Sequence, residues 1–240
     1  MPVELIGKAL EGAKAAGISN IVALRGDPPK GQEEWKATEG GFTCALDLVQ
    51  HIKKHYGNEF CISVAGYPEG HPTVIKKIEP GKVLSESETR RVVTLDDGEY
   101  VCFDDDYAKE LAYLKSKVDA GADAIITQMF FDGNVFLQFV KDCRAIGINC
   151  PILPGIMVIQ SYGGFNRMVA FCKSRVPAHV RAALDAVKDD DNAVKAEGVR
   201  LGTEMCRQLL DNGVHGLHFY TLNMEEVTFA ILNNLGLKKV

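Results

Sequence analysis

The spacing of apolar positions along the 240-residue chain alternates between helical and strand patterns. In residues 3–16, Leu5, Ile6, Leu10 and Ala13 recur at the three- and four-residue intervals of an amphipathic helix. A short, continuous apolar run follows most helical segments, as buried strands of a parallel sheet require. The alternation therefore predicts a series of βα units.

Five strands are expected, at residues 20–24, 60–65, 124–128, 151–156 and 216–221. The helices are expected at 3–16, around 42–52, and at 107–120, 134–146, 163–173, 191–212 and 225–235. This series fits a (β/α)8 barrel with about five of its eight units, and it also fits an open doubly wound sheet. No Gly-x-Gly-x-x-Gly or phosphate-loop motif follows a strand, which weakens the nucleotide-binding form of the open sheet. We expect one domain over residues 1–240.

Residues 73–107 interrupt the βα pattern. Two β-prone runs flank Asp97-Gly98, a dipeptide that favours a tight hairpin turn. We therefore expect an inserted β-hairpin at about 74–106, beside His71. Surface insertions are most often solvated loops without function, and a flap near a bound cofactor is the alternative.

Composition and charge exclude several classes of protein. The net charge is −5 and no basic tract is present, so nucleic acid and anionic membranes are poor partners. The longest nearly apolar run, residues 151–159, is far shorter than the ~20 residues that cross a bilayer, and residues 1–12 do not form a signal peptide. The seven cysteines include no Cys-x-x-Cys pair, which indicates free thiols in a reducing compartment and no zinc site. We expect a cytoplasmic protein without a metal.

Polar residues gather where the apolar strands end. Because ligands bind at the C-terminal ends of parallel strands, these side chains should converge on one rim. Singly, each has a structural interpretation, such as an ion pair between Arg25 and Asp27 or a loop role for His71. The strand-end residues are Arg25, Asp27, Tyr67, His71, Gln128 and Tyr220.

Five segments together resemble the signature of the methylenetetrahydrofolate reductase family. They are NIVALRGDPP at 20–29, VAGYPEGHP at 64–72, AGADAIITQMFFD at 120–132, PILPGI at 151–156 and HFYTLN at 218–223. The resemblance covers nearly the whole chain apart from residues 73–107. It implies a TIM barrel that binds FAD without a covalent bond. It also implies NADH or NADPH as the co-substrate in reducing 5,10-methylenetetrahydrofolate to 5-methyltetrahydrofolate.

The resemblance further implies roles for individual residues. It places Asp27 and Gln128 at the reacting centre. There, the carboxylate would stabilise the cationic form of the substrate, and the amide would bind folate or nicotinamide. Tyr220 joins these two in the implied substrate site. The residues that it places around FAD are Arg25, Gly26, Asp27, Ala45, Tyr67, His71 and Lys117.

The chain departs from the family pattern near its start and at some binding positions. The family's first barrel strand carries a glutamate that helps to open the folate ring, and nothing before residue 20 resembles that strand. We therefore expect a truncated barrel without this glutamate, whose open edges a second copy or a partner would cover. Cys44 stands where many relatives have a tyrosine, and Met224 replaces an arginine that could bind the folate tail.

Two other functions stay open. One is a non-catalytic half-barrel that binds or scaffolds a relative, which the missing glutamate favours. The other is an unrelated barrel enzyme that acts on a phosphorylated small molecule, which the specificity of the five segments disfavours.

Overall fold

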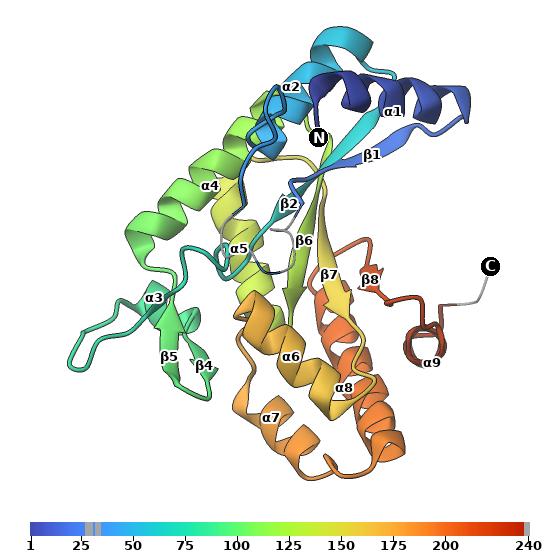
Figure 1. The fold of residues 1–240 in the computed structure, drawn as a ribbon. Coiled ribbons are helices and arrows are strands. Elements are labelled where there is room, and N and C mark those ends of the chain that lie inside the picture. Colours follow the sequence, from blue (N-terminus) through green and yellow to red (C-terminus); the bar gives the residue numbers. More distant parts are fainter. Residues whose placement is uncertain (27–30, 32–34, 238–240) are drawn as a thin grey trace.

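A curled sheet of five parallel strands forms the centre of the computed structural model, which describes residues 1–26, 31 and 35–237 (Figure 1). The strands pair in the order β1-β2-β6-β7-β8, and each pair is parallel. Each lies where an apolar run predicted it. They are β1 (Asn20–Ala23), β2 (Cys61–Gly66), β6 (Ala124–Phe130), β7 (Ile152–Met157) and β8 (His218–Tyr220).

The strand order decides between the two folds that the sequence left open. In a doubly wound sheet the order reverses at a switch point, whereas barrel strands follow one another around the barrel in chain order. Here each strand of the sheet lies beside the preceding one, once the inserted β3–β5 are set aside. The fold is therefore a partial (β/α)8 barrel, as predicted.

Helices cover the outside of the curled sheet and its ends (Figure 1). Their apolar faces explain this placement; α5, for example, buries Val135, Phe136, Phe139 and Cys143 along one side. The sequence prediction missed α3 and α7. The helices are α1 (Val3–Ala15), α2 (Ala45–Tyr56), α3 (Glu86–Arg90), α4 (Asp104–Asp119), α5 (Gly133–Ala145), α6 (Tyr162–Cys172), α7 (Ala178–Asp185), α8 (Asp191–Asp211) and α9 (Glu226–Asn234).

Two hydrophobic clusters stabilise this arrangement. The larger joins the outer face of the sheet to the helices around it, and Ile62, Ile125 and Phe136 in it are fully buried. The smaller lies where β6 and β7 end, and includes Phe165 of α6 and Leu184 of α7. The second cluster fixes the segments that follow β6 and β7, so it supports the rim on which the predicted site residues lie.

The insertion forms a three-stranded antiparallel sheet with the order β3-β5-β4. Strands β4 (Val93–Leu95) and β5 (Gly98–Val101) make the expected hairpin. Its two-residue turn is Asp96-Asp97, because Leu95 pairs with Gly98. Strand β3 (Lys76–Lys77) was not predicted.

The insertion packs against the barrel, so the expectation of a solvated loop was wrong. Val93, Val101 and Cys102 are fully buried. The Lys173 ammonium donates to the Ile75 carbonyl at 2.7 Å, which ties the start of the insertion to the end of α6. Burial on this scale makes the insertion part of the folded domain.

At the two edges of the sheet, β1 and β8 each pair with only one strand among the described residues. On β1, which pairs only with β2 there, Val22 is 47% exposed and Leu24, just after the strand, is 55% exposed. Most large apolar side chains that the described structure exposes lie near one sheet edge or the other. Near β1 they are Met1, Leu5, Ile18, Val22 and Leu24, and after β8 they are Leu222, Met224 and Leu237.

In the described part of the chain, no helix has both the length and the apolar character to cross a membrane. The same residues hold no cluster of three or more His, Cys, Asp or Glu placed to share a metal ion. All seven cysteines are free thiols. Cys102, Cys143, Cys172 and Cys206 are buried, and Cys61 is exposed.

Candidate functional site

The C-terminal ends of the strands form one rim of the sheet. The parallel register places Gly66 at the end of β2 opposite Thr127 of β6, and Met157 of β7 opposite Tyr220 of β8. The loops that follow therefore leave from the same edge. The predicted residues that the structure brings to this rim are Arg25, Tyr67, His71, Gln128 and Tyr220.

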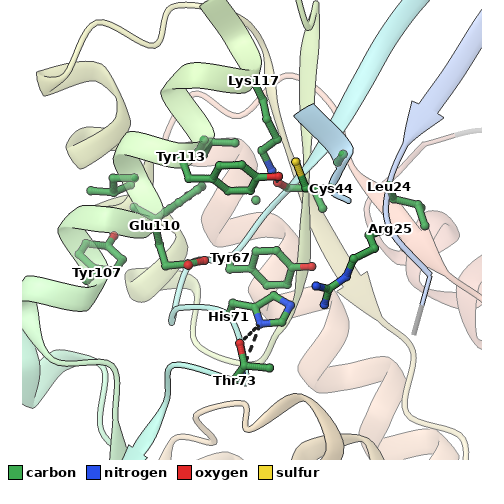
Figure 2. Close-up of a pocket in the computed structure, with 16 residues that line it drawn as sticks. Leu24, Arg25, Cys44, Tyr67, His71, Thr73, Tyr107, Glu110, Tyr113 and Lys117 are labelled. Carbon is green, nitrogen blue, oxygen red and sulfur yellow. Dashed lines mark hydrogen bonds between the residues drawn. The ribbon is translucent and has the colours of Figure 1, made fainter. Parts of the chain in front are cut away.

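A cavity of about 310 Å³ opens beside the end of β2 (Figure 2). Its walls come from the end of β1, the start of α2, the loop after β2, and α4. Its volume is at the lower end of the ~300–1,000 Å³ range of ligand pockets, so it can enclose part of a dinucleotide. The predicted cofactor residues that line it are Arg25, Ala45, Tyr67, His71 and Lys117.

Lys117 is a buried cation in the wall of this cavity. Its side chain is 4% exposed, and its ammonium donates to the Ala65 carbonyl at 2.7 Å. It makes no ion pair with any described residue, although Glu110 acts on it from a greater distance. Burial lowers the pKa of Lys117 to about 8. A buried ammonium without a partner carboxylate favours an anionic ligand such as a phosphate.

The loop after β2 brings Tyr67 and His71 to the cavity. Their rings meet edge to face, with centroids 4.7 Å apart. The Thr73 backbone N–H donates to Nδ1 of His71 at 3.3 Å, and the Thr73 hydroxyl lies 2.6 Å from the same nitrogen. Because Nδ1 accepts, the neutral ring carries its proton on Nε2. Nε2 lies on the side of the ring that faces Arg25 (Figure 2).

Glu110 and Tyr113 of α4 line the cavity and were not among the predicted site residues. Burial raises the pKa of the Glu110 carboxyl, and Tyr113 shares a hydrogen bond with the Cys44 thiol. Both lie on the helix face that carries Lys117, at spacings of three and four residues. This polar stripe on an otherwise apolar face was the signal that could have identified them.

Gln128 and Tyr220 lie on the rim but do not line the cavity. Strand β6 has a bulge just before Met129, and the Tyr220 hydroxyl donates to the Thr127 carbonyl there at 3.0 Å. The Met129 N–H donates to Oε1 of Gln128 at 2.9 Å. The amide N–H groups of Gln128 are thus the part of its side chain that can donate to a ligand. The substrate roles of Gln128 and Tyr220 stay predictions.

The loop after β1 is only partly described. The Arg25 guanidinium lies 5.1 Å from the centroid of the Trp35 ring. Gly26 follows Arg25 and does not line the cavity. Asp27, which the sequence assigns to the reacting centre and the cofactor, lies outside the described residues, so its role stays a prediction.

A family model described as "Methylenetetrahydrofolate reductase" matches residues 1–236. "Methylenetetrahydrofolate reductase (NADH) 1" of Zea mays is 53% identical over 237 residues, which are 99% of this chain and 36% of that protein. "Methylenetetrahydrofolate reductase 2" of Saccharomyces cerevisiae is 42% identical over 238 residues, 99% of this chain and 35% of that protein.

A third relative is "Probable methylenetetrahydrofolate reductase (NADPH)" of Caenorhabditis elegans. It is 40% identical over 234 residues, which are 97% of this chain and 30% of that protein. The chain therefore spans about a third of the length of the curated relatives that it matches.

Proposed function

Since the chain belongs to the methylenetetrahydrofolate reductase family, we propose that it provides the cofactor-binding part of an enzyme that reduces 5,10-methylenetetrahydrofolate to 5-methyltetrahydrofolate. NADH or NADPH would be the electron donor, because relatives are named for one or the other. The observation that carries the proposal is the convergence of Arg25, His71 and Lys117 on one cavity beside the strand ends.

The residues of this cavity fit FAD in charge and shape. Lys117 is a buried ammonium without an ion-pair partner among the described residues, and a pyrophosphate oxygen would compensate its charge. Tyr67 and Tyr113 present aromatic surfaces to the same space (Figure 2), which suits the flat parts of the cofactor. When bound, FAD would carry two electrons from the nicotinamide to the folate.

In this function the chain's own residues bind and orient the ligands. The Lys117 ammonium and the Arg25 guanidinium would hold phosphate oxygens, and Nε2–H of His71 would donate to a further acceptor. The Met129 N–H fixes the orientation of Gln128, so that its amide N–H groups would face folate or nicotinamide. Asp27 would place its carboxylate beside the reacting carbon.

The unpaired edge of the sheet at β1 indicates that other parts complete the site. Val22 on β1 and Leu24 just after it are about half exposed, and exposed apolar side chains of a barrel strand require a cover. We propose that further βα units, from a longer chain, a second copy or a partner, complete the barrel. A longer chain or a partner would also supply the glutamate of the family's first strand. The same exposure supports the alternative of a half-barrel that binds a relative and does no chemistry alone.

Flavin titration tests the proposed function. The purified chain should quench the fluorescence of added FAD in a saturable way, and Lys117→Met should lose this binding. Lys115→Met is the matched control, because Lys115 lies on the same helix and pairs with Asp119 at the surface. A wild-type chain that leaves FAD fluorescence unchanged would overturn the cofactor assignment.

Turnover separates the enzyme from the half-barrel. NADH or NADPH oxidation that depends on methylenetetrahydrofolate supports the enzyme. Binding of FAD without turnover, with activity restored by a polypeptide that carries the family's first three barrel strands, supports a half-barrel that needs a partner.

A further inference from the structure

Glu69 is a buried acid in the loop that carries Tyr67 and His71. Its side chain is 4% exposed, and it does not line the cavity. Gly70 beside it has φ +99°, and a Cβ there would lie 2.6 Å from Cβ of Cys102 in the insertion. The loop is therefore packed between the barrel and the insertion, with the Glu69 carboxyl inside the protein.

The carboxyl joins this loop to the segment between α6 and α7. The Arg175 backbone N–H donates to Oε1 of Glu69 at 2.8 Å, and the Ser174 hydroxyl also bonds to the carboxyl. Ser174 is fully buried, and its Oγ donates to the Met129 carbonyl at 3.4 Å. The hydrogen-bonded path thus runs from the cofactor loop through Ser174 to the end of β6.

The same path reaches the predicted substrate residue and the insertion. Met129, whose carbonyl accepts from Ser174, donates its N–H to the side chain of Gln128. The Arg175 guanidinium bonds Asp132, which caps α5, at 3.0 Å, and the Val92 carbonyl at 2.9 Å. One network therefore links the loop to the end of β6, the start of α5 and the insertion.

The surroundings favour the neutral form of the Glu69 carboxyl. Burial is the largest of the effects that raise its pKa to about 8; the charge of Asp132 also raises it, and Arg175 opposes both through its backbone N–H and its charge. These two are the charged groups that act on it most among the described residues. A neutral carboxyl can donate its O–H to Ser174, which then donates to Met129, so every bond in the path has a donor and an acceptor.

We propose that Glu69 is a positioning residue that fixes the loop bearing Tyr67 and His71 relative to the strand end that bears Gln128. Glu69 touches neither ligand in this arrangement. It keeps the loop that borders the cofactor cavity at a fixed position relative to the strand end that bears Gln128. The network itself follows from the contacts, whereas the identity of the ligands rests on the proposed function.

The test compares FAD binding by the wild type, Glu69→Gln and Glu69→Ala at pH 6.5 and pH 9. Glutamine resembles the neutral acid, so Glu69→Gln should bind within about twofold of the wild type at pH 6.5, and Glu69→Ala about tenfold more weakly. At pH 9 ionisation of Glu69 should weaken the wild type about tenfold relative to Glu69→Gln. Loss of charge on Lys117 at pH 9 weakens FAD binding alike in all three proteins. The comparison therefore uses the ratios of their dissociation constants at each pH.

Amide hydrogen exchange of residues 66–73, measured without FAD, is the second readout. Exchange should rise in Glu69→Ala at both pH values, and in the wild type relative to Glu69→Gln at pH 9. Glu88→Gln is the matched control, because Glu88 is a buried acid that accepts two backbone N–H groups within the insertion. It should leave exchange of this loop unchanged.

The outcomes separate the inference from the proposed function. Wild-type affinity and wild-type exchange in Glu69→Ala would overturn the positioning role. A wild-type chain that binds no FAD would defeat the proposed function, and the exchange measurement would then decide the network alone. If Glu69→Ala does not fold, the wild type and Glu69→Gln still provide a test. Equal pH dependence of their amide hydrogen exchange would overturn the positioning role.

Discussion

Lys117→Met should make the protein more stable while removing its affinity for FAD. The side chain is 4% exposed, and burial lowers the pKa of Lys117 from 10.5 to about 8. At about 1.4 kcal/mol per pKa unit, this shift costs the folded state about 3 kcal/mol when the ammonium is charged. Methionine has a similar length and no charge, so it removes that cost.

The substitution also has a smaller opposing effect. It removes the hydrogen bond to the Ala65 carbonyl, and a carbonyl left without a donor costs about 1–2 kcal/mol. We therefore expect a net increase of about 1–2 kcal/mol in the free energy of unfolding at pH 7. A residue that lowers stability but contacts the ligand is typical of a functional site.

The lowered pKa of Lys117 also determines how the stability of the wild type changes with pH. The folded-state pKa is depressed, so the wild type binds fewer protons when folded than when unfolded between pH 8 and 10.5. Wild-type stability should rise across this window, and the advantage of Lys117→Met should shrink by up to about 3 kcal/mol. Urea unfolding at pH 7 and near pH 10 measures both quantities.

Lys115→Met is the control, with the same change on the exposed side of α4. Its surface ion pair with Asp119 should be worth less than about 1 kcal/mol. A Lys117→Met protein that is less stable than the wild type at pH 7, or whose advantage does not change with pH, would refute the reasoning. Undiminished affinity for FAD would remove Lys117 from the cofactor site.

Three further predictions follow from the same contacts. Glu69 has a raised pKa, so its contribution to stability is complete below about pH 4.5 and lost as pH rises to about 8. Relative to Glu69→Gln, the wild-type free energy of unfolding in urea should fall by up to about 3 kcal/mol from pH 5.5 to 7.5, and a constant difference would contradict this. Gly155→Ala should cost about 2–4 kcal/mol, because its Cβ would lie 2.2 Å from the Thr127 carbonyl oxygen. Gly163→Ala, which meets no atom within 4 Å, should instead be neutral or stabilising in the same urea assay. Tyr220→Phe loses its bond to Thr127, so calorimetry should show a loss of about 1 kcal/mol; an unchanged value would mean that this bond does not stabilise the bulge.

The barrel strands could be predicted from the sequence because each strand has its own local pattern of apolar residues. The run at Ile152–Met157 is apolar on both faces, and the run at Cys61–Gly66 has Ser63 as its one hydroxyl residue; such runs are typical of parallel strands buried under helices. The hairpin was also found from the Asp97-Gly98 dipeptide, although its turn lies one residue earlier, at Asp96-Asp97. Helix α7 was missed because it is short, and its apolar face matters only against α6 and α8.

Some residues of the site could be predicted from the sequence, and others became visible only in the folded structure. Arg25, Tyr67 and His71 were found through motifs, since residues at strand ends follow the strands that the pattern already locates. Lys117 lies on α4 and was found through the family resemblance alone. Tyr113 was not found, because whether that face of α4 borders a cavity depends on the packing of α2 and the loop after β2. Glu69 was part of a recognised segment, but its burial depends on Ser174 and Arg175, more than a hundred residues away.

The sequence alone thus determined the parallel βα class, the family, and the side chains available at the strand ends. These are properties of spacing and residue type, which the chain carries in any conformation. Only the tertiary structure decided the one-directional strand order, the docking of the insertion, and the buried state of Lys117 and Glu69. The physical reason is that desolvation and long-range hydrogen bonds arise only when distant segments meet, and these interactions set the charge on both groups.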